Sequence, residues 1–376
     1  YTKPATFSID LTDRHSMASE HQYLITVYGT YFIASILFSF LINRLFLKFV
    51  RTLGIRNQDD TVIRWGSQSK PAVGGFSFYI LFLLSIITYS IFFDSNQVFL
   101  NKEFIGLLLA SMLGFLLGLA DDAYNTKPFL KFLTQVTCAV ILMVTGTEIS
   151  LSYVEPVNYV ITIVWVVGIM NSLNMLDNMD AITSTVSISI ILSAMVVMIF
   201  HQEVGSVYFM VLTGVMAALI GFLYFNWNPS KMYMGDTGSQ FLGVFLAATG
   251  IKYLWNAEPP SGDLISARNL LLPLIVFIMP IIDTTTVVIN RLGRGKSPFI
   301  GGKDHTTHAL AYLGLTDRQV ALVFWGMTLV SLLLVVIIER FLVSWTHLYT
   351  TLFSVYLIVM FGVFFYATRT VERNLR

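Results

Sequence analysis

Apolar stretches long enough to cross a lipid bilayer recur along the whole of this 376-residue chain. A membrane-spanning helix needs about 20 predominantly apolar residues to cross about 30 Å of hydrocarbon. Eleven segments meet this requirement, namely 24–47, 72–93, 103–120, 129–147, 157–174, 181–200, 205–225, 238–256, 268–290, 318–338 and 345–367. Only 12% of the residues are charged, compared with about 25% in soluble domains. The sequence therefore predicts an all-α integral membrane protein with about eleven transmembrane helices.

The distribution of Lys and Arg predicts which ends of these helices face the cytoplasm. Cytoplasmic loops carry an excess of basic residues. With the N-terminus outside and the C-terminus in the cytoplasm, 17 of the 23 basic residues lie inside and 6 lie outside. We therefore expect this orientation, in the inner (cytoplasmic) membrane of a cell.

One polytopic catalytic domain is expected to occupy residues 23–368. Residues 1–22 are polar and are interpreted as a flexible lead or an expression remnant, and residues 369–376 as a cytoplasmic tail. The net charge of +1 gives no indication of nucleic-acid binding, and the single Cys138 excludes a disulfide framework. The sequence leaves open whether the protein is a homodimer.

Carboxylates that adjoin apolar sequence gather at the expected cytoplasmic helix ends. These residues are Asp121, Asp122, Asp177, Asp180 and Asp236. A carboxylate close to hydrocarbon is costly unless it has a cation, a polar partner or a water-filled cleft. Each acid alone could cap a helix or meet lipid headgroups. Five acids in three short segments at one membrane depth favour a shared polar site.

The segment that contains Asn174, Asp177 and Asp180 places an amide and two carboxylates at intervals of three residues. On a helix, side chains with this spacing face roughly the same way. Such a face could bind the edge of a uracil base or hold water around Mg²⁺. A solvated helix cap is the alternative interpretation.

The segment from Asn226 to Ser239 combines several features of a phosphate site. Pro229 is expected to end the preceding helix, and Gly235 and Gly238 let the backbone approach a ligand closely. Asp236 stands where the next helix should begin, and a helix N-terminus favours anions. An ordinary capped loop is the alternative.

A basic segment near the C-terminal end of the chain carries two histidines. Arg291, Arg294, Lys296 and Lys303 precede the sequence Asp304-His305-Thr306-Thr307-His308. The two histidines could bind Zn²⁺, but no Cys or third His accompanies them, and the surrounding oxygen ligands favour Mg²⁺ or Mn²⁺. Phosphate contact is the expected role of the histidines, and a solvated basic loop is the alternative.

Oxygen ligands, basic residues and helix N-termini at one membrane face suit phosphoryl transfer between a soluble nucleotide and a lipid. A secondary transporter with an acidic ion site is the main alternative, and a structural membrane protein is a third. Transporters hold their key acids near the bilayer midplane. In this sequence only Asp283 lies deeper within an apolar segment.

Five motifs in order resemble those of the polyprenyl-phosphate N-acetylhexosamine-1-phosphate transferases, a group of glycosyltransferase family 4 type. The motifs are Pro71-Ala72-Val73-Gly74-Gly75, Asp121-Asp122, Asn174 to Asp180, Met234 to Ser239, and Ser297-Pro298-Phe299 followed by residues 304–308. The resemblance extends from about Pro71 to Arg318. It implies transfer of a sugar-1-phosphate from a UDP-N-acetylhexosamine to a polyprenyl phosphate such as undecaprenyl phosphate. The reaction would release UMP, depend on Mg²⁺ or Mn²⁺, and initiate cell-surface glycan synthesis, for example of lipopolysaccharide.

The resemblance also implies roles for individual residues. Asp236 is expected to hold the metal, and Asp121 or Asp122 to act as the base for the lipid phosphate. Asp177, Asp180, His305 and His308 are the remaining catalytic candidates. The substrate-binding candidates are Asn174, Asn226, Tyr233, Lys131, Lys303 and Arg294, with Tyr233 stacking on uracil.

The sequence departs from the family pattern at three places. Asn125 stands where a third Asp often follows the aspartate pair, and Thr307 and Ala309 make the histidine motif less dense than usual. The run of three histidines typical of the branch that uses UDP-muramyl-pentapeptide is absent. The resemblance therefore favours the branch that uses UDP-N-acetylglucosamine or a related UDP-N-acetylhexosamine, and eleven rather than ten spans agree with it.

Overall fold

The computed structural model describes residues 11–53, 70–93, 100–258, 266–297, 302–342 and 344–374, and these ranges are almost entirely helical. The helices of the first half are α1 (Leu11–Leu53), α2 (Gly75–Phe92), α3 (Lys102–Tyr124), α4 (Pro128–Val144), α5 (Glu155–Leu176), α6 (Ile182–Phe200) and α7 (Val207–Asn226). The helices of the second half are α8 (Gly235–Gly250), the π-helix η2 (Ile251–Trp255), α9 (Ser266–Val276), α10 (Ile278–Leu292), α11 (Thr306–Tyr312), α12 (Asp317–Phe341) and α13 (His347–Asn374). The all-α prediction is confirmed.

Eight helices in the described ranges are long and apolar enough to cross a membrane: α1, α2, α3, α5, α6, α7, α12 and α13. The pair α9 and α10 is bent by 82° and would add a ninth crossing if it forms one span. Each of the eleven predicted segments coincides with a helix or a helix pair, but α4 has only 17 residues and α8 only 16. Eleven crossings and the orientation of the termini therefore stay predictions.

Prolines explain the bend between α9 and α10. Pro273 lies inside α9, and Pro280 lies in the first turn of α10. Proline has no backbone N–H, and its ring clashes with the preceding turn of a helix, so a proline in a helix interior bends or breaks the helix. The first turn of a helix tolerates proline. The chain therefore ends one helix and begins another near Phe277.

The ends of the chain are more helical than the sequence suggested. α1 begins at Leu11, within the predicted lead of residues 1–22, and α13 continues to Asn374, within the predicted tail of residues 369–376. The segments 54–69 and 298–301 lie outside the described residues. The first includes much of the connection between the predicted spans 24–47 and 72–93, and the second includes the Pro298-Phe299 pair.

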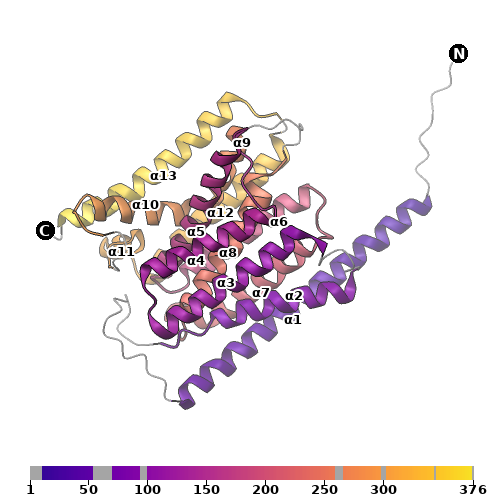
Figure 1. The fold of residues 1–376 in the computed structure, drawn as a ribbon, viewed down its shortest axis with the longest axis horizontal. Helices are drawn as coiled ribbons and strands as arrows, with labels where there is room; N and C mark the ends of the chain where they lie inside the picture. Colours follow the sequence, from indigo (N-terminus) through magenta and orange to yellow (C-terminus); the bar gives the residue numbers. More distant parts are fainter. Residues whose placement is uncertain are drawn as a thin grey trace.

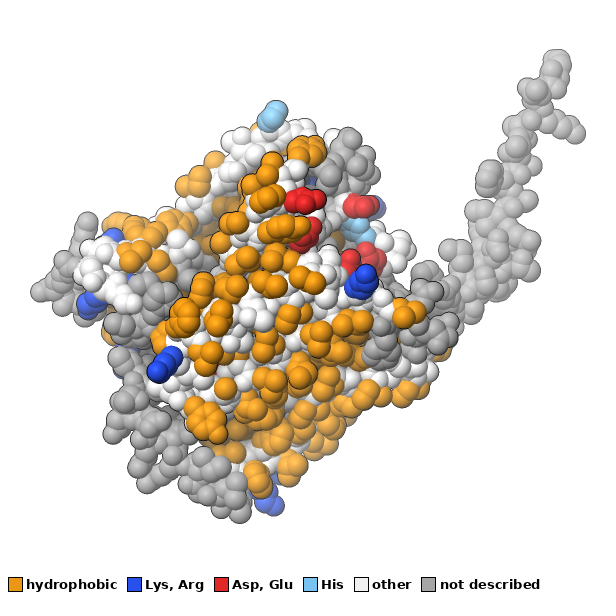
Figure 2. Space-filling model, viewed as in Figure 1, with side chains coloured by type: hydrophobic (Ala, Val, Ile, Leu, Met, Phe, Trp, Pro, Cys, Tyr) orange, Lys and Arg blue, Asp and Glu red, His pale blue; other side chains and the backbone are white. Residues whose placement is uncertain are grey.

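The other helices surround α8 (Figure 1). Almost all residues of α8 are buried. α8 packs against α3 and α5, while α1 lies along α7 at one side of the bundle and α13 lies at the opposite side. Hydrophobic side chains cover most of the face shown in Figure 2, and the charged ones lie near its edges. An apolar exterior around an apolar core is expected of helices surrounded by lipid.

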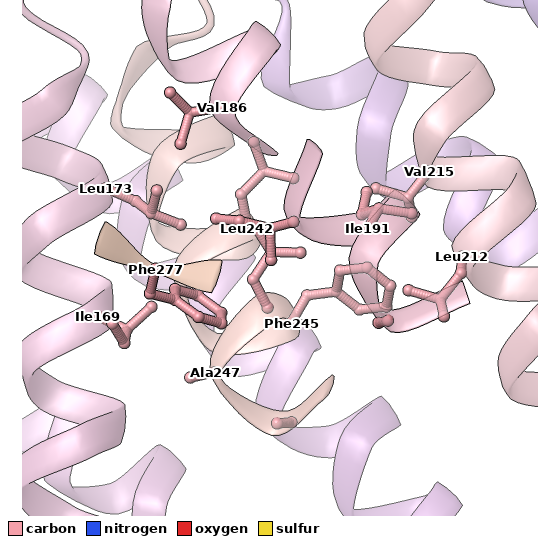
Figure 3. Packing of buried hydrophobic residues seen from close by; sticks show 14 of the residues in the cluster. Ile169, Leu173, Val186, Ile191, Leu212, Val215, Leu242, Phe245, Ala247 and Phe277 are labelled. Carbon is pink, nitrogen blue, oxygen red and sulfur yellow. The ribbon is translucent and has the colours of Figure 1, made fainter. Parts of the chain in front are cut away.

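Branched and aromatic side chains fill the space around the middle of α8 (Figure 3). Leu242 and Phe245 of α8 are fully buried and meet Leu173 of α5, Leu212 of α7 and Phe277. A helix that is apolar on all sides is stable only when it is enclosed in this way. This packing fixes α8, and with it the polar N-terminal turn at one end of the bundle.

Glycines allow other helices to approach that turn. A Cβ atom on Gly118 of α3 would overlap the backbone of Asp236 and Thr237, and one on Gly75 of α2 would overlap Gly238. Backbone atoms cannot move aside as a flexible side chain can. α3 and α2 therefore reach the start of α8 only because these two positions lack side chains.

Replacing Gly118 by Ala is expected to destabilise the protein by about 1–3 kcal/mol, because overpacking of a well-packed contact costs this much. Thermal unfolding in detergent measures the effect. Gly168→Ala on α5 is the matched control, since no atom lies within 4 Å of the added Cβ. Equal melting temperatures for the two variants would contradict the close contact between α3 and α8.

Candidate active site

The first turn of α8 brings the ends of other helices together around Asp236. Asn174, in the last turn of α5, donates hydrogen bonds from Nδ2 to Asp236 Oδ1 at 2.6 Å and to Ser239 Oγ at 2.9 Å. The amide therefore fixes the carboxylate of Asp236 relative to α5. It also places the predicted nucleotide-binding segment beside the predicted metal ligand.

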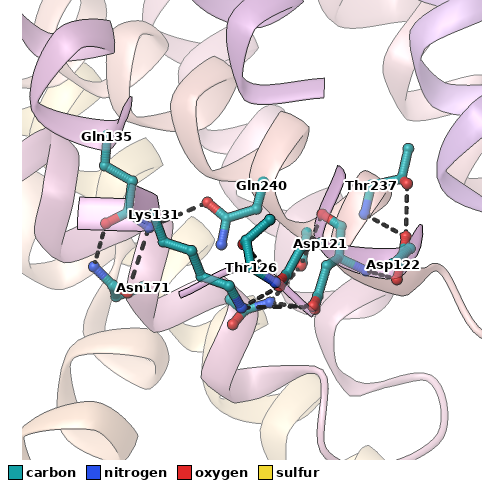
Figure 4. Close-up of polar contacts among 11 residues, drawn as sticks. Asp121, Asp122, Thr126, Lys131, Gln135, Asn171, Thr237 and Gln240 are labelled. Atoms are coloured by element: carbon teal, nitrogen blue, oxygen red, sulfur yellow. Dashed lines mark hydrogen bonds and ion pairs between the residues drawn. The ribbon is translucent and has the colours of Figure 1, made fainter. Parts of the chain in front are cut away.

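Lys131 of α4 lies between two carboxylates of this site (Figure 4). Its ammonium group forms an ion pair with Asp121 of α3 and lies 3.9 Å from Asp236 Oδ2. Asp121 Oδ1 also accepts hydrogen bonds from the backbone N–H and the hydroxyl of Thr126, both at 2.8 Å. A cation between two like charges offsets their repulsion.

The turn that joins α3 to α4 explains how Lys131 reaches Asp121. Asn125 ends α3 in the left-handed conformation with φ of 49°, and Pro128 occupies the start of α4. Asn tolerates the left-handed conformation better than most residues, and proline is well suited to the first helical turn. Asn125, the first departure from the family pattern, is therefore a helix cap.

Asp122 anchors the start of α8. Its carboxylate accepts hydrogen bonds from Asp236 N at 2.9 Å, from Thr237 N at 2.8 Å and from Thr237 Oγ1 at 2.6 Å. A carboxylate in this place satisfies helix N–H groups that have no intrahelical partner and complements the helix dipole. Asp122 therefore positions Asp236, and a role in proton transfer stays a prediction.

Asp180 and Asn226 hold the loop that precedes α8. Asp180 accepts hydrogen bonds from Ser230 N at 2.9 Å and from Ser230 Oγ at 2.7 Å. Asn226 is buried; it accepts from Ala181 N and donates to Met232 O, each at 3.1 Å. These contacts support the loop from within the protein, so a direct substrate contact of Asn226 stays a prediction.

Tyr233 joins two of the sequence motifs. It pairs with Ala72 in an isolated β-bridge, and its N–H donates to Pro71 O at 2.9 Å. Gly74 N donates to Tyr233 O at 3.1 Å. The half-buried ring lies 5.1 Å from the ammonium group of Lys70, a residue that sequence reasoning did not assign to the site.

The histidine segment is anchored by Asp283 of α10. Its Oδ2 lies 2.8 Å from His305 Nδ1, and its Oδ1 accepts from Thr306 N at 2.8 Å and from Thr306 Oγ1 at 2.5 Å. The ring of His308 meets that of His305 edge to face, with 5.3 Å between centroids. The only sequence signal for this role was an isolated acid inside an apolar segment.

A hydrogen bond links the histidine segment to the nucleotide-binding candidates. Thr307 Oγ1 donates to Asn178 Oδ1 at 2.7 Å, and Asn178 directly follows Asp177, the half-buried cap of α5. Thr307, the second departure from the family pattern, thus brings His305 and His308 to the same end of the bundle as Asp236.

Arg291 organises the connection between α10 and α11. Its guanidinium donates to both carboxylate oxygens of Asp304, at 2.9 and 2.6 Å. Burial raises the pKa of Asp304, but the hydrogen bond and the positive charge of Arg291 outweigh it and lower the pKa below its usual value. Arg294 is half-buried and Lys303 is exposed on the same connection.

The acidic side chains around Lys131 suit some of the candidate metal ions better than others. Within the described ranges, no group of three or more His, Cys, Asp or Glu side chains is arranged to hold a metal ion. Zn²⁺ sites use three or four such side chains, whereas Mg²⁺ is commonly held by one or two carboxylates together with water and substrate phosphates. Asp236, with Asp121 nearby, fits Mg²⁺.

These features define a multi-helix membrane protein with a carboxylate and lysine site at one end of its bundle. Residues 104–254 match the model of glycosyl transferase family 4. The chain is 30% identical over 287 residues to the phospho-N-acetylmuramoyl-pentapeptide-transferase of Staphylococcus saprophyticus, covering 69% of this chain and 82% of the relative. The chain therefore belongs to this family of polyprenyl-phosphate sugar-phosphate transferases, which confirms the resemblance.

Two further relatives carry names from another branch. The chain is 25% identical over 301 residues to the probable undecaprenyl-phosphate N-acetylglucosaminyl 1-phosphate transferase of Bacillus subtilis, covering 77% of this chain and 78% of the relative. It is 26% identical over 288 residues to the decaprenyl-phosphate N-acetylglucosaminephosphotransferase of Mycolicibacterium smegmatis, covering 69% of each.

The buried environment of His308 should make the stability of the protein depend on pH. Burial and the nearby His305 lower the pKa of His308 to about 3. The unfolded chain binds a proton at this residue near pH 6.5, so the free energy of unfolding falls as the pH decreases from about 6.5 to 3. Between pH 7.5 and 5, the free energy of unfolding of the wild type should therefore fall by about 1–2 kcal/mol more than that of His308→Gln.

Melting temperatures of both proteins across this pH range measure the difference. His347→Gln is the matched control, because His347 lies exposed at the start of α13. The buried environment of His308 is contradicted if His308→Gln and the wild type lose stability in parallel as the pH falls.

Proposed function

We propose that this protein transfers N-acetylhexosamine-1-phosphate from a UDP-sugar to undecaprenyl phosphate and releases UMP. The family supports transfer of a sugar-1-phosphate to a polyprenyl phosphate, and two of the relatives are named for transfer of an N-acetylglucosamine phosphate to such a lipid. The observation that carries the proposal is the cluster of Lys131, Asp121, Asp236 and Asn174 at the N-terminus of α8.

The chemistry is a displacement at the β-phosphorus of the UDP-sugar. An oxygen of the lipid phosphate forms a bond to this phosphorus, and the bond to the oxygen shared with the α-phosphorus breaks. UMP leaves with that oxygen and its electron pair. Phosphoryl transfer of this kind depends on positioning and charge neutralisation rather than on a covalent enzyme intermediate.

The residues of the cluster supply these two requirements. Lys131 offers a positive charge to the diphosphate at the start of α8, where Asp122 already accepts hydrogen bonds from the N–H groups of Asp236 and Thr237. Asp121, beside Lys131, accepts a proton from the lipid phosphate when the latter is protonated. Mg²⁺, or Mn²⁺ in its place, would be held by Asp236 and, when bound, would neutralise charge on the diphosphate.

The histidine segment supports N-acetylglucosamine as the sugar. Relatives from both branches are 25–30% identical to the chain, so overall similarity does not choose between them. The three-histidine run of the muramyl-pentapeptide branch is absent, and Thr306 and Thr307 stand between the two histidines of this chain. The hydroxyl of Thr307 donates to Asn178 Oδ1. UDP-N-acetylglucosamine is therefore the proposed donor.

The bundle supports an active site at a single membrane face. Asp121, Asn174 and Asp236 lie at the C-terminal ends of α3 and α5 and at the N-terminal end of α8. With the orientation predicted from the basic residues, this face is the cytoplasmic side of the inner membrane, where UDP-sugars occur. Every residue of the cluster comes from one chain, so a homodimer is not needed to form it.

A transporter is less well supported. Asp283, the acid expected deeper in the membrane, is fully buried and accepts hydrogen bonds from the start of α11. An acid engaged in this way anchors a neighbouring segment rather than lining an ion path.

The proposal is tested by measuring UMP release from purified protein with undecaprenyl phosphate and a panel of UDP-sugars, with Mg²⁺ or with excess chelator. We expect release with UDP-N-acetylglucosamine and its loss on chelation. Asp236→Asn should lower turnover by about 10³-fold or more, the scale of losing an essential charged group, while its melting temperature stays close to that of the wild type.

Ser152→Ala, on the opposite end of the bundle, is the control and should retain wild-type turnover. Full activity of Asp236→Asn would contradict the role of this residue. Absence of UMP with every donor, in protein shown to be folded, would contradict the proposed function.

A further inference from the structure

We propose that three amide side chains, Gln135, Asn171 and Gln240, form a positioning layer for the active site, which we call the amide layer. The inference rests on the proposed function, because it concerns the geometry of that reaction. None of the three residues belongs to the sequence motifs, although Gln240 directly follows one motif and Asn171 lies three residues before another.

The three side chains are joined by hydrogen bonds across three helices (Figure 4). Asn171 Nδ2 donates to Gln135 Oε1 at 2.8 Å, and Gln135 Nε2 donates to Gln240 Oε1 at 3.2 Å. Gln135 and Gln240 are each only 1% exposed. Buried amides away from water keep such bonds because an unpaired polar group is costly.

The helical spacing places the amide layer directly beneath the site. Gln135 follows Lys131 by four residues on α4, and Gln240 follows Asp236 by four residues on α8. Asn171 precedes Asn174 by three residues on α5. Residues three or four apart lie on one face of a helix, one turn of about 5.4 Å from each other. Each amide thus supports one residue of the site, one turn deeper in the bundle.

The amide layer ties together two helices that otherwise meet little. α4 packs mainly against α3 and α5 and has few contacts with α8. The bond from Gln135 to Gln240 is a direct link between the helix of Lys131 and the helix of Asp236. A hydrogen bond of this kind holds only in one register, because sliding α4 by one residue would displace Gln135 by about 1.5 Å.

Apolar side chains of similar size would fill the same space without fixing that register. A displacement of about 1 Å at a reacting group can cost about 10²-fold in rate. The amide layer therefore acts through Lys131 and Asp236, as a set of positioning residues that does not touch substrate.

The test is the double variant Gln135→Met/Gln240→Met. Replacing both partners by apolar groups of similar shape leaves neither of them unpaired. The half-buried Asn171 loses its bond to Gln135 but keeps its hydrogen bond to Val167 O at 2.8 Å, so stability should change little. We expect a melting temperature within a few degrees of the wild type, a kcat that falls about 10- to 100-fold, and a KM for the UDP-sugar within about 3-fold. The single variant Gln135→Met leaves Gln240 without this bond and should melt lower than the double variant.

Asn158→Leu is the matched control. Asn158 is a buried amide on α5 as well, about 20 Å along the helix from Asn171, and it binds Leu151 N and Ser152 N. This variant should lose melting temperature but keep its kcat per folded molecule.

The results of these measurements distinguish a failure of the amide-layer proposal from a failure of the proposed function. If the wild type releases UMP and the double variant keeps its kcat, the amide layer has no positioning role and the proposed function stands. If the fall in kcat of the double variant only matches the fall in its fraction of folded protein, the layer is structural and the inference is wrong. If folded wild-type protein releases no UMP, the proposed function fails, and the inference fails with it.

Discussion

The active site depends on one positive charge placed between two negative ones. Asp121 and Asp236 come from different helices and repel each other at the edge of an apolar bundle, and Lys131 offsets part of that repulsion. Its ion pairs also join α4 to α3 and α8. The proposed reaction requires the same arrangement, since the diphosphate of the proposed donor needs positive charge that is already oriented.

The acids at this end of the bundle serve two different purposes. Asp122, Asp180 and Asp283 accept hydrogen bonds from backbone N–H groups at the starts of α8, of the loop before it and of α11. Asp121 and Asp236 face Lys131, and Asp121 also accepts a hydrogen bond from the backbone N–H of Thr126. Asp122, Asp180 and Asp283 thus fix backbone segments around the site. The positions of Asp121 and Asp236 depend on these segments.

Hydropathy was sufficient to locate the long helices, because lipid requires long apolar segments, but it did not indicate the short helix α11. It did not predict the 82° bend between α9 and α10, which depends on where two prolines fall within the helices. The motifs indicated that Asp121, Asn174 and Asp236 belong to one site. The sequence left open whether each acid is a cap or a site residue, and only tertiary contacts separate Asp122 from Asp121. Gln135, Asn171 and Gln240 were missed as a group because single polar residues on three separate helices carry no common pattern.

In the proposed reaction, the β-phosphate travels with the sugar to the lipid. The most direct measurement supplies UDP-N-acetylglucosamine labelled with ³²P at the β-phosphate, together with undecaprenyl phosphate, and then separates the lipid and aqueous products. The account predicts that the label appears in the lipid fraction and that the released UMP is unlabelled. Label recovered in aqueous UDP, with an unlabelled glycolipid, would show transfer of the sugar alone and would contradict the account.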